Sequence, residues 1–240
     1  MISERKFATS FGSFWSSITP LMEEYLQSVN SRTRTYAIEV PSTVRGDLSA
    51  VFSEIAFELF THAVENRLDS VLKLDPKTVR LRSRHAIVGF LRTKQLEHRF
   101  TNEDEKEIHD LARNLLAYFQ RHELNSVIIR PVFKGCGIVN ECEGDASVIN
   151  VLVEVKAVQR NFSSADMRQI LVYLALMHAE SLDVARSVVL LNPRLGVFTE
   201  LNSRELAIEV SGMELFRLLD EIILYMSDLS NVLLPDLNID

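Results

Sequence analysis

Residues 133–173 read FKGCGIVNECEGDASVINVLVEVKAVQRNFSSADMRQILVY, and this stretch decides the fold that we predict. Its pattern predicts a strand, a turn, a second strand and then a helix. The second strand, Val151–Ala157, is β-branched or apolar except at Glu154 and Lys156. A buried strand seldom carries two charged side chains without a reason. These two charges therefore mark a candidate functional site.

The spacing of the charged residues predicts that they meet. Residues two apart in an extended strand lie about 6.6 Å apart and point the same way, so Glu154 and Lys156 should share a face. Asp145 follows the strand-like run GCGIVN (135–140), and a link at 147–150 would fold that run back beside the charged strand. We therefore expect Asp145 to face Glu154 across the strand pair.

These residue types favour phosphate chemistry on a divalent metal ion. Two carboxylates at one point repel each other unless a cation neutralises them. Their hard oxygen atoms suit Mg²⁺. A lysine beside such an ion can orient a water molecule or stabilise the charge that develops on a phosphate.

The order of these residues resembles that of the PD-(D/E)XK nuclease superfamily. The resemblance lies in Asp145, then Glu154-Val155-Lys156 on the next strand, then Gln169 and Tyr173 spaced as Gln-x-x-x-Tyr on a helix. The last element is similar to the RecB-like branch. Gly144 stands where the motif has its proline, the least constrained letter of the motif. The resemblance covers about a third of the chain, residues 125–211.

The resemblance implies a fold and a reaction. It implies an α/β protein with a restriction-endonuclease-like core, in which helices flank a central mixed sheet, and with an N-terminal helical extension. It implies hydrolysis of DNA phosphodiester bonds with Mg²⁺ or Mn²⁺ held by Asp145, Glu154 and the Val155 carbonyl. Lys156, Gln169 and Tyr173 would complete the catalytic residues.

The resemblance also implies a further acidic ligand and a biological setting. A helix that precedes the sheet would supply the acid. Glu54 is the best positional match, and Glu58 is the alternative. Either residue could instead be an ordinary solvated glutamate. The run GCGIVNECEGDA followed by EVKA is similar to small nucleases of bacterial anti-phage defence loci. An effector or restriction component of this kind would have as partners DNA and a protein of the same system, such as an ATPase or helicase.

The net charge of −7 is unusual for a nucleic-acid enzyme, because phosphate binding uses lysine and arginine. Residues 73–99 nevertheless carry eight basic residues against two acidic ones, and they could follow a DNA backbone or form a solvated face. Candidate contacts to DNA in this segment are Arg82, Arg84, Arg92 and Lys94. Beside the motif, Arg160 and Arg168 could contact phosphate or pair with Asp166.

Composition limits the class of protein. The content of hydrophobic residues, 47%, is that of a globular chain, and no uninterrupted apolar run reaches the roughly 18 residues of a membrane span. The N-terminus MISERKFATS lacks the apolar core of a secretory signal, so we expect a cytoplasmic protein. Cys136 and Cys142 cannot build a disulfide framework or a zinc site, and we expect free buried thiols.

The remaining elements complete the prediction. We expect residues 1–122 to form a helical and basic region that packs on a nuclease core at 123–240. Helices are predicted at 11–29, 47–68, 101–121 and 212–227, and another helix is predicted to follow Ser163. Pro20 should divide or kink the first of them, and Asp47 and Ser163 should cap the helices that they begin. Strands are predicted at 36–40, within 125–157 as a three-strand meander, at 186–191 parallel to Val151–Ala157, at GVFTEL (196–201) and at 206–210.

Two other functions fit the same residues. A nuclease fold that has lost catalysis could bind nucleic acid or support assembly of a complex. An unrelated α/β enzyme with a coincidental Glu-x-Lys would place Asp145 and Glu154 far apart. The leucine-rich stripe of the last helix fits either core packing or a dimer or partner surface.

Overall fold

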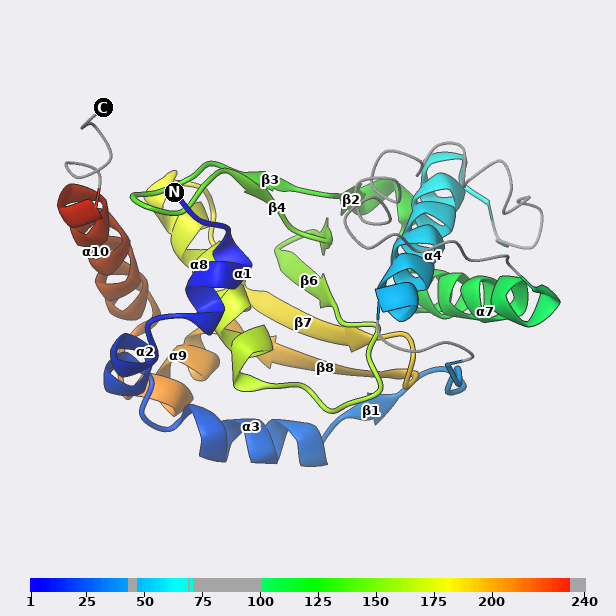
Figure 1. Cartoon of the computed structure of the whole chain (residues 1–240), viewed down its shortest axis with the longest axis horizontal. Helices are drawn as coiled ribbons and strands as arrows, with labels where there is room; N and C mark the ends of the chain where they lie inside the picture. Colours follow the sequence, from blue (N-terminus) through cyan, green and yellow to red (C-terminus); the bar gives the residue numbers. More distant parts are fainter. Residues whose placement is uncertain (43–46, 69, 71–100, 234–240) are drawn as a thin grey trace.

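A six-stranded mixed sheet forms the centre of the computed structural model, which describes residues 1–42, 47–68, 70 and 101–233 (Figure 1). The strand order is β1-β8-β7-β6-β5-β2, and β6 and β7 are parallel while the other pairs are antiparallel. Its strands are β1 (Arg34–Thr35), β2 (Val127–Ile129), β5 (Ala146–Val148), β6 (Val151–Val155), β7 (Ser187–Asn192) and β8 (Val197–Asn202). A separate pair is formed by β3 (Val132–Phe133) and β4 (Cys142–Glu143).

Helices cover both faces of this sheet (Figure 1). One face carries α1 (Glu4–Thr9), α2 (Gly12–Ile18), α3 (Met22–Ser31), α8 (Ser164–Ala179), α9 (Ser203–Ser211) and α10 (Leu215–Leu233). The other carries α4 (Asp47–Glu65) and α7 (Asn102–Phe119), with a short 3₁₀ turn at Leu124–Ser126. The predicted α/β class, a central mixed sheet flanked by helices, is therefore confirmed.

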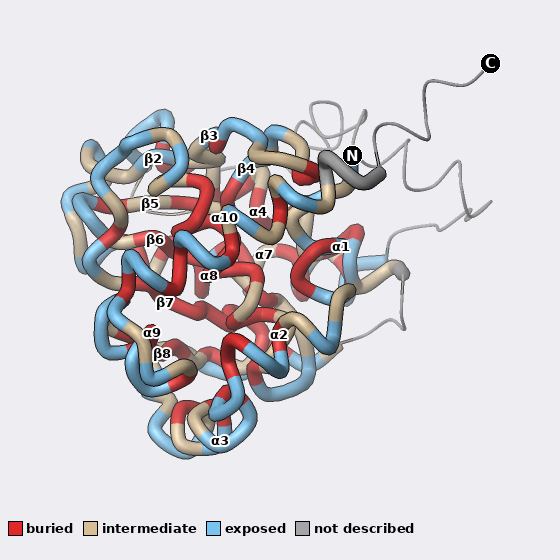
Figure 2. Tube along the Cα trace, turned by 90° about the vertical axis from the view of Figure 1, so that its left-hand side faces the viewer, coloured by how far each residue is buried: buried red, intermediate tan, exposed pale blue. Residues whose placement is uncertain are grey.

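Alternation along the central strands divides the core into two layers. Leu152, Val188 and Leu190 pack toward α8, whereas their neighbours Val153 and Val189 pack toward α4 and α7. Side chains of a strand alternate between faces, so each strand serves both layers. Figure 2 shows that α8 and β7 are buried along most of their length.

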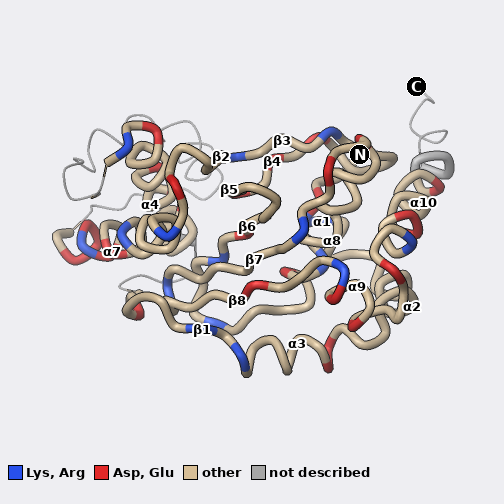
Figure 3. The backbone as a smooth tube through the Cα atoms, turned by 180° about the vertical axis from the view of Figure 1, so that it is seen from behind, with Lys and Arg blue, Asp and Glu red and all other residues tan. Residues whose placement is uncertain are grey.

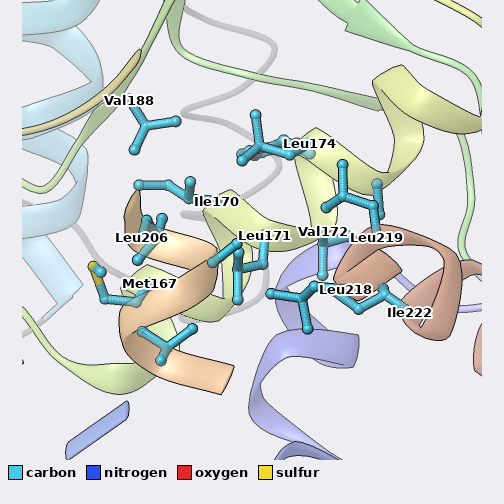
Figure 4. Packing of buried hydrophobic residues seen from close by; sticks show 14 of the residues in the cluster. Met167, Ile170, Leu171, Val172, Leu174, Val188, Leu206, Leu218, Leu219 and Ile222 are labelled. Atoms are coloured by element: carbon cyan, nitrogen blue, oxygen red, sulfur yellow. The ribbon is translucent and has the colours of Figure 1, made fainter. Parts of the chain in front are cut away.

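Helix α8 is the centre of the larger layer. Figure 4 shows its side chains packed against those of α9 and α10. Met167, Ile170 and Leu174 are fully buried, and burial of such a side chain stabilises the fold by roughly 1.5–3 kcal/mol. Because α8 is fixed on one side by this layer and on the other by the sheet, polar residues on it are held in defined positions.

Capping residues determine where the predicted helices begin. Thr101 and Asp104 form a capping box at the start of α7, and Ser163 and Asp166 form one at the start of α8. The region around Pro20 separates α2 from α3, as the sequence predicts. The helix expected at 47–68 is α4, and the strand expected to run parallel to β6 is β7.

Two predicted strands are wrong. No strand forms at 36–40: strand β1 ends at Thr35, and the backbone N–H of Val40 donates to the Arg194 carbonyl at 2.7 Å. The GCGIVN run turns at Gly137, where φ is 56° and the backbone lies against the Met226 carbonyl. The strand that folds back beside β6 is β5, so Asp145 precedes the paired strand instead of ending its predecessor.

The strand expected at 206–210 is also wrong, because this segment lies in α9. The Asn202 side chain caps α9 by accepting hydrogen bonds from the backbone N–H groups of Arg204 and Glu205, at 3.0 and 3.2 Å. Gly212, at φ 71°, ends α9, so the last helix begins at Leu215 instead of 212.

The N-terminal elements pack directly on the rest of the chain. Helix α1 lies against α8, β1 pairs with β8, and α4 packs on α7. The division near residue 122 stays a prediction. Within the described ranges, no helix combines the length and the apolar character that a membrane span requires.

Candidate active site

A cleft of about 530 Å³ opens at the carboxyl end of β6. It lies between α1 and α8 on one side and α4 on the other, and Figure 3 shows acidic and basic positions along these elements. Asp145, Val155, Lys156 and Gln169 contribute to its lining. Four of the residues that the motif singles out therefore meet at one cavity.

Strand register places Asp145 opposite the Glu-x-Lys strand. Ala146 pairs with Val153, so the residue before Ala146 lies across from Glu154. The Asp145 Oδ2 atom accepts a hydrogen bond from the Val155 backbone N–H at 2.6 Å. Among the residues described, none donates a hydrogen bond to the other Asp145 oxygen, which is thus available to a ligand.

Glu154 and Lys156 share the face of β6 that α8 covers. The Lys156 Nζ atom lies 2.7 Å from Glu154 Oε1 and 2.7 Å from Gln169 Oε1. It lies 3.7 Å from Asp166 Oδ1. Both Glu154 and Lys156 are buried, with 2% and 7% of their surfaces exposed. The ammonium group is therefore held at the cleft wall by a strand residue and by α8.

Burial raises the pKa of both carboxyl groups, and their mutual repulsion adds to the effect on Glu154. Burial and the nearby Asp145 carboxylate raise the pKa of Glu154 to about 8, against the opposing effect of Lys156. Burial also raises the pKa of Asp145, although the Val155 N–H and the Lys156 charge act to lower it. A bound cation would remove this conflict.

Gln169 and Tyr173 continue the network along α8. The Gln169 amide donates to the Tyr173 hydroxyl at 2.9 Å and to Glu4 Oε1 at 3.2 Å. The Tyr173 hydroxyl donates to the Glu143 carbonyl at 3.3 Å. The pair thus faces the site, and Gln169 orients the lysine while Tyr173 orients Gln169.

The two candidate acids of α4 are bound to an arginine. Arg130 Nη2 lies 2.7 Å from Glu54 Oε1 and 2.7 Å from Glu58 Oε1, and its guanidinium lies over the Phe57 ring. Glu54 lines the cleft that holds Asp145, and Glu58 does not. The structure thus brings Glu54 to the site but gives it a cationic partner. Arg130 itself adopts a left-handed backbone conformation, at φ 51°.

Of the basic residues predicted to contact DNA, some line the cleft, some do not, and some lie outside the described residues. Arg160 lines the cleft but pairs with Asp166 through two hydrogen bonds of 2.7 and 3.1 Å, which is the alternative that the sequence leaves open. The Arg168 guanidinium lies over the Trp15 ring, away from the cleft lining. The basic candidates of segment 73–99, Arg82, Arg84, Arg92 and Lys94, lie outside the described residues.

The donor atoms present fit a divalent ion held by two carboxylates. Mg²⁺ in proteins commonly uses one or two carboxylates and keeps several water molecules. Asp145, Glu154 and the Val155 carbonyl supply oxygen donors, and a cation among them would offset the burial and the Asp145 charge that raise the pKa of Glu154. No group of three or more His, Cys, Asp or Glu side chains suited to a metal ion is found in the described part of the chain.

Sequence reasoning missed two arginines of the cleft, Arg5 and Arg130. Arg5 comes from α1 and Arg130 from the link between β2 and β3, far from the motif in sequence. Neither has a local pattern that marks it. Gly144, by contrast, has a structural reason to differ from proline, because its N–H donates to the Pro131 carbonyl at 2.9 Å.

Comparison with known proteins gives no relative for this chain: no family model, no curated protein and no solved structure matches it.

Proposed function

We propose that the protein is a metal-dependent nuclease of the PD-(D/E)XK type that hydrolyses DNA, built on a restriction-endonuclease-like core. One observation carries the proposal: Asp145, Lys156 and Gln169 line one cleft in the order of that motif, and the buried Glu154 pairs with Lys156 at 2.7 Å. Chance occurrence of Glu-x-Lys does not require this convergence.

Asp145, Glu154 and the Val155 carbonyl would hold Mg²⁺ or Mn²⁺. When bound, such an ion polarises the scissile phosphate and lowers the pKa of a water molecule. The strand register fixes the two carboxylates relative to each other, because the Asp145 side chain is bonded to the backbone of the strand that bears Glu154.

Lys156 acts on the reacting phosphate. Its ammonium group neutralises negative charge that develops on the phosphate oxygens and orients the attacking water. Gln169 and Tyr173 hold the ammonium in place through the bonds described above. Attack of water on phosphorus, with cleavage of the bond to the 3′ oxygen, gives a 5′-phosphate and a 3′-hydroxyl.

The setting that we propose is a bacterial anti-phage defence system, in which the protein is an effector or restriction component. A net charge of −7 favours delivery of the DNA by a partner, such as an ATPase or helicase of the same system. Arg160 and the basic residues of segment 73–99 are the candidate contacts to that DNA.

A catalytically degenerate nuclease fold is the second candidate. The observation that favours it is the ion pairing of Glu54 with Arg130, which occupies the third acid of the cleft. Such a module would bind nucleic acid or support a complex without cutting.

The test compares wild-type protein with Lys156→Met and Lys156→Ala on supercoiled plasmid, with Mg²⁺ or Mn²⁺. We expect nicking by the wild type and a loss of roughly 10²–10³-fold in the variants. Lys106→Ala is the matched control, since Lys106 is an exposed lysine of α7 that pairs with Asp110. Melting temperatures show whether each variant is folded. If the wild-type protein binds Mn²⁺ and DNA but does not cut the plasmid, the nuclease proposal is excluded and the catalytically degenerate module is supported.

A further inference from the structure

Among the residues that the structure describes, four cationic side chains border the cleft, and three of them already have anionic partners. The four are Arg5, Arg130, Lys156 and Arg160. Arg130 is bound by the two glutamates of α4, Lys156 by Glu154, and Arg160 by Asp166. In the part of the chain that the structure describes, the guanidinium of Arg5 makes neither a hydrogen bond nor an ion pair.

Arg5 projects from a backbone that is fixed to the body of the molecule. The Ile2 N–H donates to the Ile138 carbonyl at 2.8 Å, and the Ile2 carbonyl accepts from the Asn140 N–H at 2.9 Å. Glu4, beside Arg5, accepts the hydrogen bond from the Gln169 amide. Helix α1 is thus attached at its start to the segment before β4 and to α8, and its exposed arginine has a defined base.

The Phe7 side chain orients α1. Phe7 is fully buried among aromatic rings that include Trp15 and Tyr225, and it turns the opposite side of the helix outward. Arg5 and Thr9, one helical turn apart, are exposed and both line the cleft. The side of α1 that faces the cleft is therefore the side that carries the arginine.

Arg5 lines the same cleft as Asp145, Lys156 and Gln169 without being bonded to any of them. A guanidinium carries five N–H donors in a planar fork that matches two oxygens of a phosphate. Arg5 thus offers free donors at the rim of the site, next to the place where the scissile phosphate would lie.

We propose that Arg5 is a substrate-binding residue that grips a backbone phosphate of the nucleic acid beside the scissile one. This inference rests on the proposed function and deepens it. The contact is independent of base sequence, because phosphate oxygens carry no sequence information. It gives α1, which lies far from the motif in sequence, a direct part in holding the substrate.

The test measures binding separately from cutting. Fluorescence anisotropy with a fluorescein-labelled DNA duplex is recorded at a series of NaCl concentrations, with Ca²⁺ in place of Mg²⁺, for wild type, Arg5→Ala and Lys6→Ala. Lys6 is the matched control, an exposed cation on the same helix that does not line the cleft. Melting temperatures are compared for all three.

We expect Arg5→Ala to weaken binding and to reduce the slope of log K against log[salt] by about 0.9, the value for one phosphate contact on a duplex. A purely structural role for Arg5 would leave this slope unchanged. Lys6→Ala should keep the wild-type slope. In plasmid cleavage, Arg5→Ala should raise KM more than it lowers kcat.

The outcomes separate the two proposals. If wild type cuts plasmid and Arg5→Ala keeps the wild-type affinity and slope, the role of Arg5 is overturned and the nuclease stands. If wild type binds DNA without cutting, the nuclease is overturned, and the slope still decides the role of Arg5. A wild type that neither binds nor cuts overturns both.

Discussion

Two buried ion pairs lie beside the same cleft, and their surroundings differ. Arg194 and Glu107 are joined at 2.8 Å with both side chains almost completely buried. Lys156 and Glu154 are joined at 2.7 Å and are buried nearly as well, but Asp145 adds a second carboxylate to them. The Arg194 guanidinium also donates to the carbonyls of Val40 and Ala157 and to the hydroxyl of Ser49.

The difference shows how a buried pair that supports the fold can be distinguished from one that serves a site. In the Arg194 pair, the guanidinium meets the Glu107 carboxylate, and neutral oxygens accept its other hydrogen bonds. In the Lys156 pair, one cation lies beside Glu154 and Asp166 and near Asp145, and burial together with the Asp145 charge raises the pKa of Glu154 to about 8. Surplus charge of this kind, next to an open cleft, is typical of functional sites. Substitutions at the two pairs test this distinction.

The largest effect that we expect is on stability, at the balanced pair. Arg194→Ala removes the guanidinium that lies 2.8 Å from the buried Glu107 carboxylate and should lower the free energy of unfolding by about 3–5 kcal/mol. Urea denaturation measures this loss. Arg113→Ala is the control, because Arg113 makes a half-exposed pair with Asp110, and such pairs contribute roughly 0–1 kcal/mol. A similar small loss for Arg194→Ala would remove the distinction between the two pairs.

The surplus pair should respond in the opposite sense. Glu154→Gln keeps the shape of the side chain but removes a carboxylate that repels Asp145. We expect plasmid cleavage to fall by roughly 10²–10³-fold while stability near pH 8 increases. Denaturation and cleavage are measured on the same preparation. A Glu154→Gln protein that is less stable than wild type at this pH would show that the carboxylate is held as tightly as the one on Glu107.

The pH dependence of stability follows from the raised pKa of Glu154. The folded protein holds this proton up to about pH 8, whereas the unfolded chain releases it near the ordinary value of 4.5. The folded state therefore binds more protons between these values, so the contribution of Glu154 is complete below about pH 4.5 and is lost as pH rises to about 8. The difference in stability between wild type and Glu154→Gln should show this trend. A flat difference would contradict it.

The sequence predicted the surplus pair well because its geometry is local to two strands. Alternation along β6 places Glu154 and Lys156 together, and the helical period brings Gln169 and Tyr173 to one side of α8. Asp145 meets Glu154 as predicted, although through β5 instead of GCGIVN. The partner at Arg130 could not be predicted, because it depends on how α4 packs beside a link 72 to 76 residues away, which no local pattern encodes.

The sequence-based prediction of strands is wrong at two places where a single residue sets the course of the backbone. Gly137 turns the GCGIVN run where we expect a strand, and Asn202 caps a helix that continues through 206–210, where we also expect one. In each case a tertiary contact or a cap decides the backbone conformation. The basic residues of 73–99 lie outside the described part of the chain, so their role stays a prediction.

The turn that presents Asp145 gives an intermediate effect. Gly144→Pro would restore the letter of the motif but would remove the hydrogen bond to the Pro131 carbonyl and place a Cβ 3.0 Å from the Phe133 ring. Phe133 packs on Tyr173, so the site should be disturbed as well. We expect a loss of about 1–3 kcal/mol in stability and lower activity. Gly144→Ala, which keeps the N–H, should be milder; equal losses in both would show that the hydrogen bond does not matter.

The smallest effect concerns the acids of α4, which share Arg130 in a half-exposed cluster. Glu54→Gln and Glu58→Gln each weaken one bond to Arg130, so the effects on that cluster cancel when the two variants are compared. Glu54 lines the cleft and Glu58 does not. If the Glu54 carboxylate adds negative charge to the metal site, Glu54→Gln should weaken Mn²⁺ binding by about threefold to tenfold, and Glu58→Gln should not. This loss corresponds to about 0.7–1.4 kcal/mol. Calorimetric titration with Mn²⁺ measures this difference. Equal affinities in the two variants would assign Glu54 to the arginine and leave the ion to Asp145 and Glu154.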